Sequence, residues 1–271
     1  MKTENNIKPW RVGLLAITLS LMLIAVGFLA YASAFYHADE TALEALASDD
    51  AVSVVETGYG WLFDGPSDDA ALVFYPGAKV EEMSYAPLLR ELAAGGLDAC
   101  LVRVPLRFAF FKPNAAAKVM KEHDYETWYV GGHSLGGVVA SCYASGHADE
   151  VSGTVLLASY PVTRLPESQI EIMIIGSKDG VINREQMEKS RARAPKHFYE
   201  HVIEGGNHSR FGSYGEQNGD GEALIPAGPP RLSWGTCRRS VSKRQKEIVR
   251  CVSAYPMYGS TSDNSFSRMT N

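Results

Sequence analysis

Gly132-His133-Ser134-Leu135-Gly136 is the stretch on which the fold prediction depends. The pattern Gly-x-Ser-x-Gly arises often by chance, so its meaning depends on its surroundings. Residues 127–130 before it are β-branched or aromatic, which is typical of a buried strand, and the small apolar residues 138–144 after it favour a helix. A strand that enters a helix through one tight turn presents its serine above the edge of the sheet. The stretch therefore predicts a nucleophilic Ser134 rather than a structural turn serine.

Strands and helices alternate on both sides of this turn. A hairpin is expected between residues 52 and 63, and further strands at 71–75, 99–104, 127–130, 153–158, 171–175 and 198–203. Helices are expected after Ser84, after Asn114, at 138–144 and after Asn183, with the two asparagines and Ser84 as N-caps. The alternation predicts an α/β fold with a doubly wound, mostly parallel sheet. Ligands of such sheets bind beyond the carboxyl ends of the strands.

Two further polar side chains follow strand ends and complete a catalytic set. A serine hydroxyl needs a base to accept its proton and a third group to orient that base. Asp179 follows the strand at 171–175 and His208 follows the last strand, so the order Ser134, Asp179, His208 fits an elbow on a parallel sheet. The alternatives are a turn aspartate before glycine and an exposed loop histidine. His133 is expected to pack or orient, because adjacent residues do not converge easily on one proton.

An oxyanion needs backbone donors, and a substrate needs a pocket. The N–H groups of Leu135 and of Ala78, after the turn at 75–77, are the expected oxyanion donors, with Lys79 as the neighbouring alternative to Ala78. Three phenylalanines follow the end of a strand and either line an acyl pocket or plug the core beneath their loop: Phe108, Phe110 and Phe111.

The chain begins with a segment that does not belong to the globular fold. Residues 1–11 carry the cations Lys2, Lys8 and Arg11, and the uncharged run 12–36 is long enough to cross a bilayer as a helix. Cations on the N-terminal side predict a single-pass anchor with a cytoplasmic start and an extracytoplasmic domain. The alternative is a secretory signal cleaved after Ala32-Ser33-Ala34. Both interpretations export the domain.

The overall composition limits the possible partners. Of the 271 residues, 45% are hydrophobic, so a substantial core can be buried. The net charge of −5 gives no support for a nucleic-acid partner. The four cysteines contain no Cys-x-x-Cys pair, so a zinc site has no support. No cofactor and no metal are expected.

Five motifs carry a resemblance to a known superfamily. They are residues 75–80 (YPGAKV), 103–106 (RVPL), the elbow, 176–180 (GSKDG) and 206–215 (GNHSRFGSYG). Together they resemble the α/β-hydrolases, and within them a small, lidless, membrane-anchored bacterial group. The resemblance spans residues 52–223, within an expected hydrolase domain at 51–223. Residues 38–50 are acidic and rich in alanine, which predicts a tether with a short helix at 37–50 before that domain. It does not specify the substrate, since the superfamily hosts many acyl chemistries.

The last part of the chain departs from this resemblance, which implies a terminal amphipathic helix. Residues 225–230 (IPAGPP) break a helix, and little periodicity follows. The segment 224–271 is therefore expected to be an atypical, poorly ordered tail. One hypothesis is that a frameshift replaced the usual C-terminus, which translation of the neighbouring reading frame would test.

The expected function follows from these observations. The sequence predicts an exported serine hydrolase that cleaves small-molecule carboxylic esters, or related acyl bonds, through an acyl-enzyme. The short loop between residues 159 and 171 favours an open cleft for small or extended esters. Two alternatives remain open: a surface binding protein that kept the scaffold but lost turnover, and an acyltransferase with the same triad.

Overall fold

The computed structural model describes residues 8–67 and 69–225. The chain divides into two units, Met1–Phe35 and Tyr36–Asn271. Of the predicted tail at 224–271, all but Leu224 and Ile225 lie outside the described residues.

The first unit contains one long apolar helix. Helix α1 runs from Pro9 to Ser33 and has no acidic residue in its first turn and no basic residue in its last. An 18-residue window within Trp10–Ser33 has a mean hydropathy of 2.6, so the helix is long and apolar enough to cross a membrane. A signal sequence near the N-terminus has the same properties. The helix begins earlier than the predicted run because Pro9 is well suited to the first helical turn.

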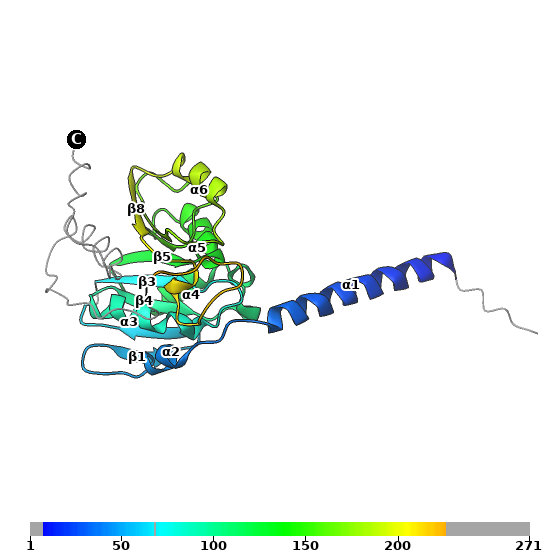
Figure 1. The fold of residues 1–271 in the computed structure, drawn as a ribbon, viewed down its shortest axis with the longest axis horizontal. Coiled ribbons are helices and arrows are strands. Elements are labelled where there is room, and N and C mark those ends of the chain that lie inside the picture. The colour runs from blue at the N-terminus through cyan, green and yellow to red at the C-terminus, as the bar shows by residue number, and fades with distance from the viewer. Residues whose placement is uncertain (1–7, 68, 226–271) are drawn as a thin grey trace, which may run out of the picture. The chain divides into compact units, whose positions relative to one another are not determined.

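The second unit is built on an eight-stranded sheet with the order β1-β2-β4-β3-β5-β6-β7-β8 (Figure 1). The strands are β1 Ser53–Glu56, β2 Gly60–Asp64, β3 Ala70–Tyr75, β4 Asp98–Val102, β5 Thr127–His133, β6 Gly153–Leu157, β7 Ile170–Gly176 and β8 His197–Ile203. The pairs β1–β2 and β2–β4 are antiparallel and the five other pairs are parallel. This confirms the predicted mostly parallel sheet and its N-terminal hairpin.

Helices cover both faces of this sheet. They are α2 Glu40–Glu44, α3 Ala86–Ala94, α4 Ala115–Glu122, α5 Leu135–Ser145 and α6 Arg184–Arg191. One core cluster joins Leu89 of α3 to Leu72 and Phe74 of β3. A second cluster, on the other face, joins Val73 of β3 to residues of α4 and α5. Because side chains alternate along a strand, β3 is buried along its whole length, as a central strand between two helical layers must be.

Helix starts were predicted less well than strands. Asn183 caps α6 as expected, because its side chain accepts a hydrogen bond from the Gln186 N–H at 3.0 Å. Ser84 is not an N-cap: it lies within the 3₁₀ turn Glu82–Tyr85, and α3 begins at Ala86. Asn114 precedes α4, but its side chain makes no capping hydrogen bond. Helix α5 begins directly after Ser134 rather than at residue 138.

The second unit begins with a backbone seam at Tyr36. The Tyr36 N–H donates to the Lys79 carbonyl at 2.7 Å, the Glu81 N–H donates to the Tyr36 carbonyl at 2.9 Å, and Tyr36 forms a parallel bridge with Val80. Within residues 37–50, expected as a tether, Ala42 of α2 is fully buried. The first residues of this unit thus pair with the chain directly after Ala78.

A buried carboxyl group on β7 makes the stability of the domain depend on pH. Glu171 is 1% exposed and lies opposite Thr154 of β6. Burial, and next the charge of Glu200, raise the pKa of Glu171 from 4.5 to about 7. Between these two values the unfolded chain loses the proton that the folded chain keeps, so stability falls as pH rises through this window.

Glu171→Gln is expected to remove this pH dependence, because glutamine stays neutral. The free energy of unfolding of the variant minus that of the wild type should be about 3 kcal/mol larger at pH 8 than at pH 4. This follows because each unit of pKa shift corresponds to roughly 1.4 kcal/mol. Urea unfolding of both proteins at the two pH values measures this difference. Parallel pH curves for the two proteins would show that Glu171 does not titrate with folding.

Candidate active site

Ser134 lies on the turn between β5 and α5 in a strained backbone conformation. Its φ is 52° and its ψ is −122°, values that a residue with a side chain seldom adopts. A Cβ at Gly132 would lie 2.5 Å from the Tyr75 carbonyl oxygen, and one at Gly136 would collide with the same atom. The turn therefore needs glycine on both sides of Ser134, which is the arrangement predicted for the elbow.

The side chains of Asp179 and His208 meet at the carboxyl edge of the sheet. Asp179 follows β7, and its Oδ2 accepts a hydrogen bond from His208 Nδ1 at 2.9 Å. Its Oδ1 accepts from the N–H groups of Val181 at 2.9 Å and Ile182 at 2.8 Å. Both partners are buried, with 4% of Asp179 and 1% of His208 exposed. Since the carboxylate only accepts, His208 Nδ1 carries the proton and Nε2 is the basic nitrogen.

His208 and the elbow are adjacent in space. His208 Nε2 is buried and has no hydrogen-bond partner among the described residues. The ring of His133, the residue before Ser134, lies 4.6 Å from the His208 ring between centroids. The structure thus brings the His208 loop against the turn that carries Ser134, although β6, β7 and β8 lie between the two residues in the sequence.

The two backbone N–H groups predicted as oxyanion donors make no hydrogen bond within the part of the chain that the structure describes. Leu135 opens α5, so its N–H has no partner within the helix. The Ala78 N–H makes no hydrogen bond to any residue in the described ranges, whereas the Lys79 N–H donates to the Arg107 carbonyl at 2.9 Å. Of the two expected candidates in this loop, only Ala78 therefore keeps its donor available.

A family model described as "Alpha/beta hydrolase family" matches residues 71–229. The chain belongs to this family. The match includes the elbow, Asp179 and His208, and it agrees with the mostly parallel sheet.

The hydrolase is also similar to several solved structures. A thermophilic esterase of Thermogutta terrifontis is 15% identical, with 59% of this chain and 83% of that chain covered and a TM-score of 0.43. Naproxen esterase of Bacillus subtilis is 13% identical, with 62% and 88% covered and a TM-score of 0.45. An esterase of Mycobacterium tuberculosis is 16% identical, with 64% and 90% covered and a TM-score of 0.45. A comparison with curated proteins found no match.

The three phenylalanines of the hydrolase follow β4 and occupy two kinds of position. Phe108 is 6% exposed, whereas Phe110 and Phe111 are each 46% exposed. The rings of Phe110 and Phe111 are in contact, with 4.4 Å between their centroids. Phe108 thus packs into the core, and the other two rings keep an open surface.

The described part of the hydrolase contains no candidate metal site. Within residues 8–67 and 69–225, no group of three or more His, Cys, Asp or Glu side chains is placed to hold a metal ion.

Asp220 is a residue of the site region that the sequence did not reveal. Its Oδ1 accepts from the N–H groups of Gly180 and His208, both at 3.1 Å, and its Oδ2 accepts from the Ser209 N–H at 2.9 Å. It therefore connects the residue after Asp179 to His208 itself. The only signal was an Asp-Gly pair in a glycine-rich stretch, which predicts a turn and no more.

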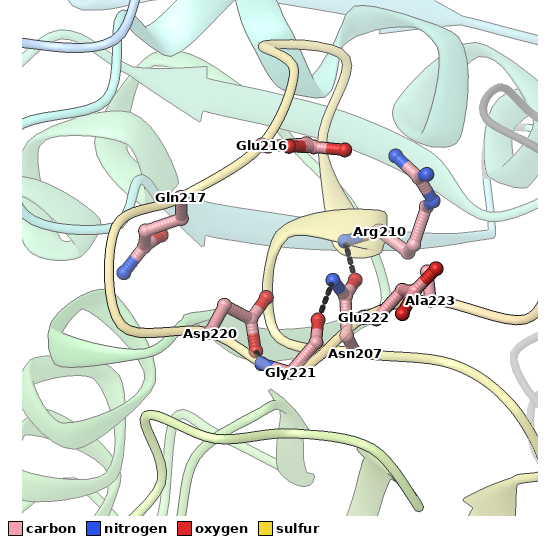
Figure 2. A pocket seen from close by; sticks show the side chains of 8 residues that line it. All are labelled: Asn207, Arg210, Glu216, Gln217, Asp220, Gly221, Glu222 and Ala223. Atoms are coloured by element: carbon pink, nitrogen blue, oxygen red, sulfur yellow. Dashed lines mark hydrogen bonds between the residues drawn. The ribbon is translucent and has the colours of Figure 1, made fainter.

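Asp220 also lines a polar pocket of about 450 Å³ (Figure 2). The other lining residues are Asn207, Arg210, Glu216, Gln217, Gly221, Glu222 and Ala223. Ser134, Asp179 and His208 do not line it, so this pocket is distinct from the surroundings of Ser134.

Asp220→Ala is expected to lower kcat about tenfold, because three backbone N–H groups around the Asp179 and His208 loops lose their acceptor. Glu216→Ala is the matched control: Glu216 is exposed, lines the same pocket, and makes no hydrogen bond to the described residues. Steady-state kinetics of both variants on one ester measure the difference. Equal kcat values in the two variants would count against a functional link between Asp220 and the Asp179–His208 pair.

Proposed function

We propose that this hydrolase cleaves carboxylic esters through an acyl-enzyme formed on Ser134. The observation that carries the proposal is the buried hydrogen bond from His208 to Asp179. It leaves a basic Nε2, with no hydrogen-bond partner in residues 8–67 and 69–225, next to the strained elbow. Such an arrangement matches the roles of nucleophile, base and orienting carboxylate.

In the first step, His208 Nε2 takes the proton of the Ser134 hydroxyl while the Ser134 oxygen bonds to the ester carbonyl carbon. The negative oxygen that forms accepts hydrogen bonds from the N–H groups of Ala78 and Leu135, and each such donor contributes about 3 kcal/mol to the transition state. His208 then gives its proton to the leaving alcohol oxygen as the carbon–oxygen bond breaks. Water repeats the sequence on the acyl-enzyme and releases the acid.

Access to this site supports small or extended esters as substrates. The connection between β6 and β7, residues 158–169, contains no helix in the described chain. In related hydrolases with lids, long insertions at this place cover the site. The half-exposed rings of Phe110 and Phe111 offer an apolar surface for an acyl or alcohol group near the strand ends.

Location is the second part of the proposal. Lys8 and Arg11 lie at the start of α1 and its last turn has no basic residue, so we infer that the chain start stays in the cytoplasm and the domain lies outside. Mass spectrometry of the mature protein tests retention of the helix as an anchor. A mature chain that starts at Phe35 would overturn the anchor and leave a secreted domain.

A fluorophosphonate probe tests the chemistry directly, since it bonds to an activated serine oxygen with loss of fluoride. The wild-type protein is expected to label and Ser134→Ala is not. Wild-type protein that stays unlabelled would favour a binding protein on a hydrolase scaffold. Hydrolysis of p-nitrophenyl esters of rising chain length, with and without an added alcohol as acyl acceptor, then separates short-chain, long-chain and acyltransferase activities.

A further inference from the structure

Tyr85 is the centre of a buried chain of hydrogen bonds. The Gly77 N–H donates to the Tyr85 hydroxyl oxygen at 3.0 Å, and the Tyr85 hydroxyl pairs with His133 Nδ1 at 2.9 Å. His133 Nε2 pairs with the backbone carbonyl of His208 at 3.0 Å. Tyr85 is fully buried, and His133 and His208 are each 1% exposed.

The chemistry of the end groups gives this chain one direction. The His208 carbonyl only accepts, so His133 Nε2 carries a proton. In a neutral ring, Nδ1 is then the acceptor, so the Tyr85 hydroxyl donates to it and keeps its lone pairs for the Gly77 N–H. Each donor and acceptor in this chain of hydrogen bonds has a partner. If any one hydrogen bond reversed its direction, a buried polar group would lose its partner, which is costly.

His133 remains neutral because of its surroundings. Burial, and next the charge of His208, lower the pKa of His133 well below 6.5. The titratable groups that face its ring are Tyr85, His208 and Tyr214, with ring centroids at 5.6, 4.6 and 6.5 Å. None of them carries a negative charge at neutral pH that would attract a second proton. When His208 is protonated in the reaction, the hydrogen bonds that join Tyr85, His133 and the His208 carbonyl therefore keep their directions.

The three loops that the chain joins are those that carry the proposed reaction. Gly77 precedes the oxyanion donor Ala78, His133 precedes Ser134, and His208 is the base. A Cβ at Gly77 would lie 2.7 Å from His133 Nδ1 and 2.8 Å from the Tyr85 hydroxyl oxygen, so only glycine lets this loop approach the pair. One hydroxyl group thus fixes the separations between donor, nucleophile and base.

We propose that Tyr85 and His133 are positioning residues that hold the Ala78 N–H, Ser134 and His208 in register for acyl transfer. The proposal rests on the proposed function, since it assigns Ser134 and His208 the same roles. It adds two residues that do not touch the reacting atoms but determine where those atoms stand.

Tyr85→Phe tests the proposal, with Tyr75→Phe as the matched control. Tyr75 is also fully buried; its hydroxyl donates to the Pro113 carbonyl at 2.8 Å and accepts from the Ala116 N–H at 2.9 Å. Each variant therefore loses one hydroxyl with two hydrogen bonds, but only Tyr85 belongs to the chain. Tyr85→Phe is expected to lower kcat by about tenfold to a hundredfold with KM changed less than about twofold. Tyr75→Phe should lose similar thermal stability and keep its kcat.

A second pair of variants covers the case in which Tyr85→Phe fails to fold. The amide of His133→Gln can still donate to the His208 carbonyl and accept from Tyr85, whereas His133→Ala can do neither. The glutamine variant is expected to keep at least about tenfold more kcat than the alanine variant. Equal losses in the two would contradict the proposal.

The outcomes separate this inference from the proposed function. If wild-type turnover depends on Ser134 but Tyr85→Phe behaves as Tyr75→Phe does, the positioning role alone is overturned. If wild-type protein shows no turnover that Ser134→Ala abolishes, the proposed function fails and the positioning role fails with it.

Discussion

Ser134→Ala is expected to lower kcat for ester hydrolysis on the order of 10⁶-fold, the loss seen when a triad serine is removed from an otherwise intact site. The reason is that no other group can form the acyl-enzyme in the proposed mechanism, so only uncatalysed attack by water remains. The measurement is the rate of release of p-nitrophenol at a substrate concentration above KM.

The fold of this variant should be unaffected. Alanine has the same Cβ as serine, so the backbone at φ 52° bears the same strain, and the hydroxyl makes no structural hydrogen bond to the described residues. Ser141→Ala is the matched control: Ser141 is buried in α5, the helix that follows Ser134, and its hydroxyl donates to the Val138 carbonyl at 2.8 Å. Activity that survives in Ser134→Ala but falls in Ser141→Ala would rule out Ser134 as the nucleophile.

Asp179→Asn is expected to lower kcat by about 10⁴-fold at neutral pH, because it changes the tautomer of the His208 ring. The N–H groups of Val181 and Ile182 both point to Oδ1, so they select the amide orientation with oxygen on that side. The NH₂ group then faces His208 Nδ1, which must become an acceptor. The ring proton moves to Nε2, and Nε2 is no longer able to take the proton of Ser134.

Asp98→Asn is the control for a buried aspartate. Asp98 lies at the start of β4; it accepts from the Gly65 N–H at 2.8 Å and from the Tyr125 hydroxyl at 2.8 Å. The Tyr125 hydroxyl can turn and accept from an amide, so this variant should fold and keep kcat. A small effect of Asp179→Asn, close to that of Asp98→Asn, would show that His208 does not depend on Asp179.

The strands and the elbow were predictable because local patterns determine them. Central strands such as β3 are apolar on both faces, and the glycines beside Ser134 mark a turn that no other residue fits. The order of the polar residues at strand ends then placed Asp179 and His208 at the same edge of the sheet, and the structure pairs them at 2.9 Å.

The residues that support the site were not predictable by the same reasoning. Tyr85 follows Ser84 in the sequence and belongs to no motif, but the turn Glu82–Tyr85 places its hydroxyl against His133, 48 positions away in the sequence. Asp220 contacts a loop 40 positions before it. Such contacts depend on how distant loops pack together, and neither periodicity nor residue spacing contains that information.

The pairing of Tyr36 with Lys79 and Glu81 determines where the domain can be shortened. These backbone hydrogen bonds lie directly beside Ala78. A truncation that removes Tyr36 would therefore remove the hydrogen bonds on one side of the proposed oxyanion loop. Cleavage before Phe35 would keep the hydrogen bonds of Tyr36 with Lys79 and Glu81. Retention of the apolar helix would also keep them. A soluble version made for crystallisation or assay therefore has to start ahead of Tyr36, even though the sheet itself begins only at Ser53.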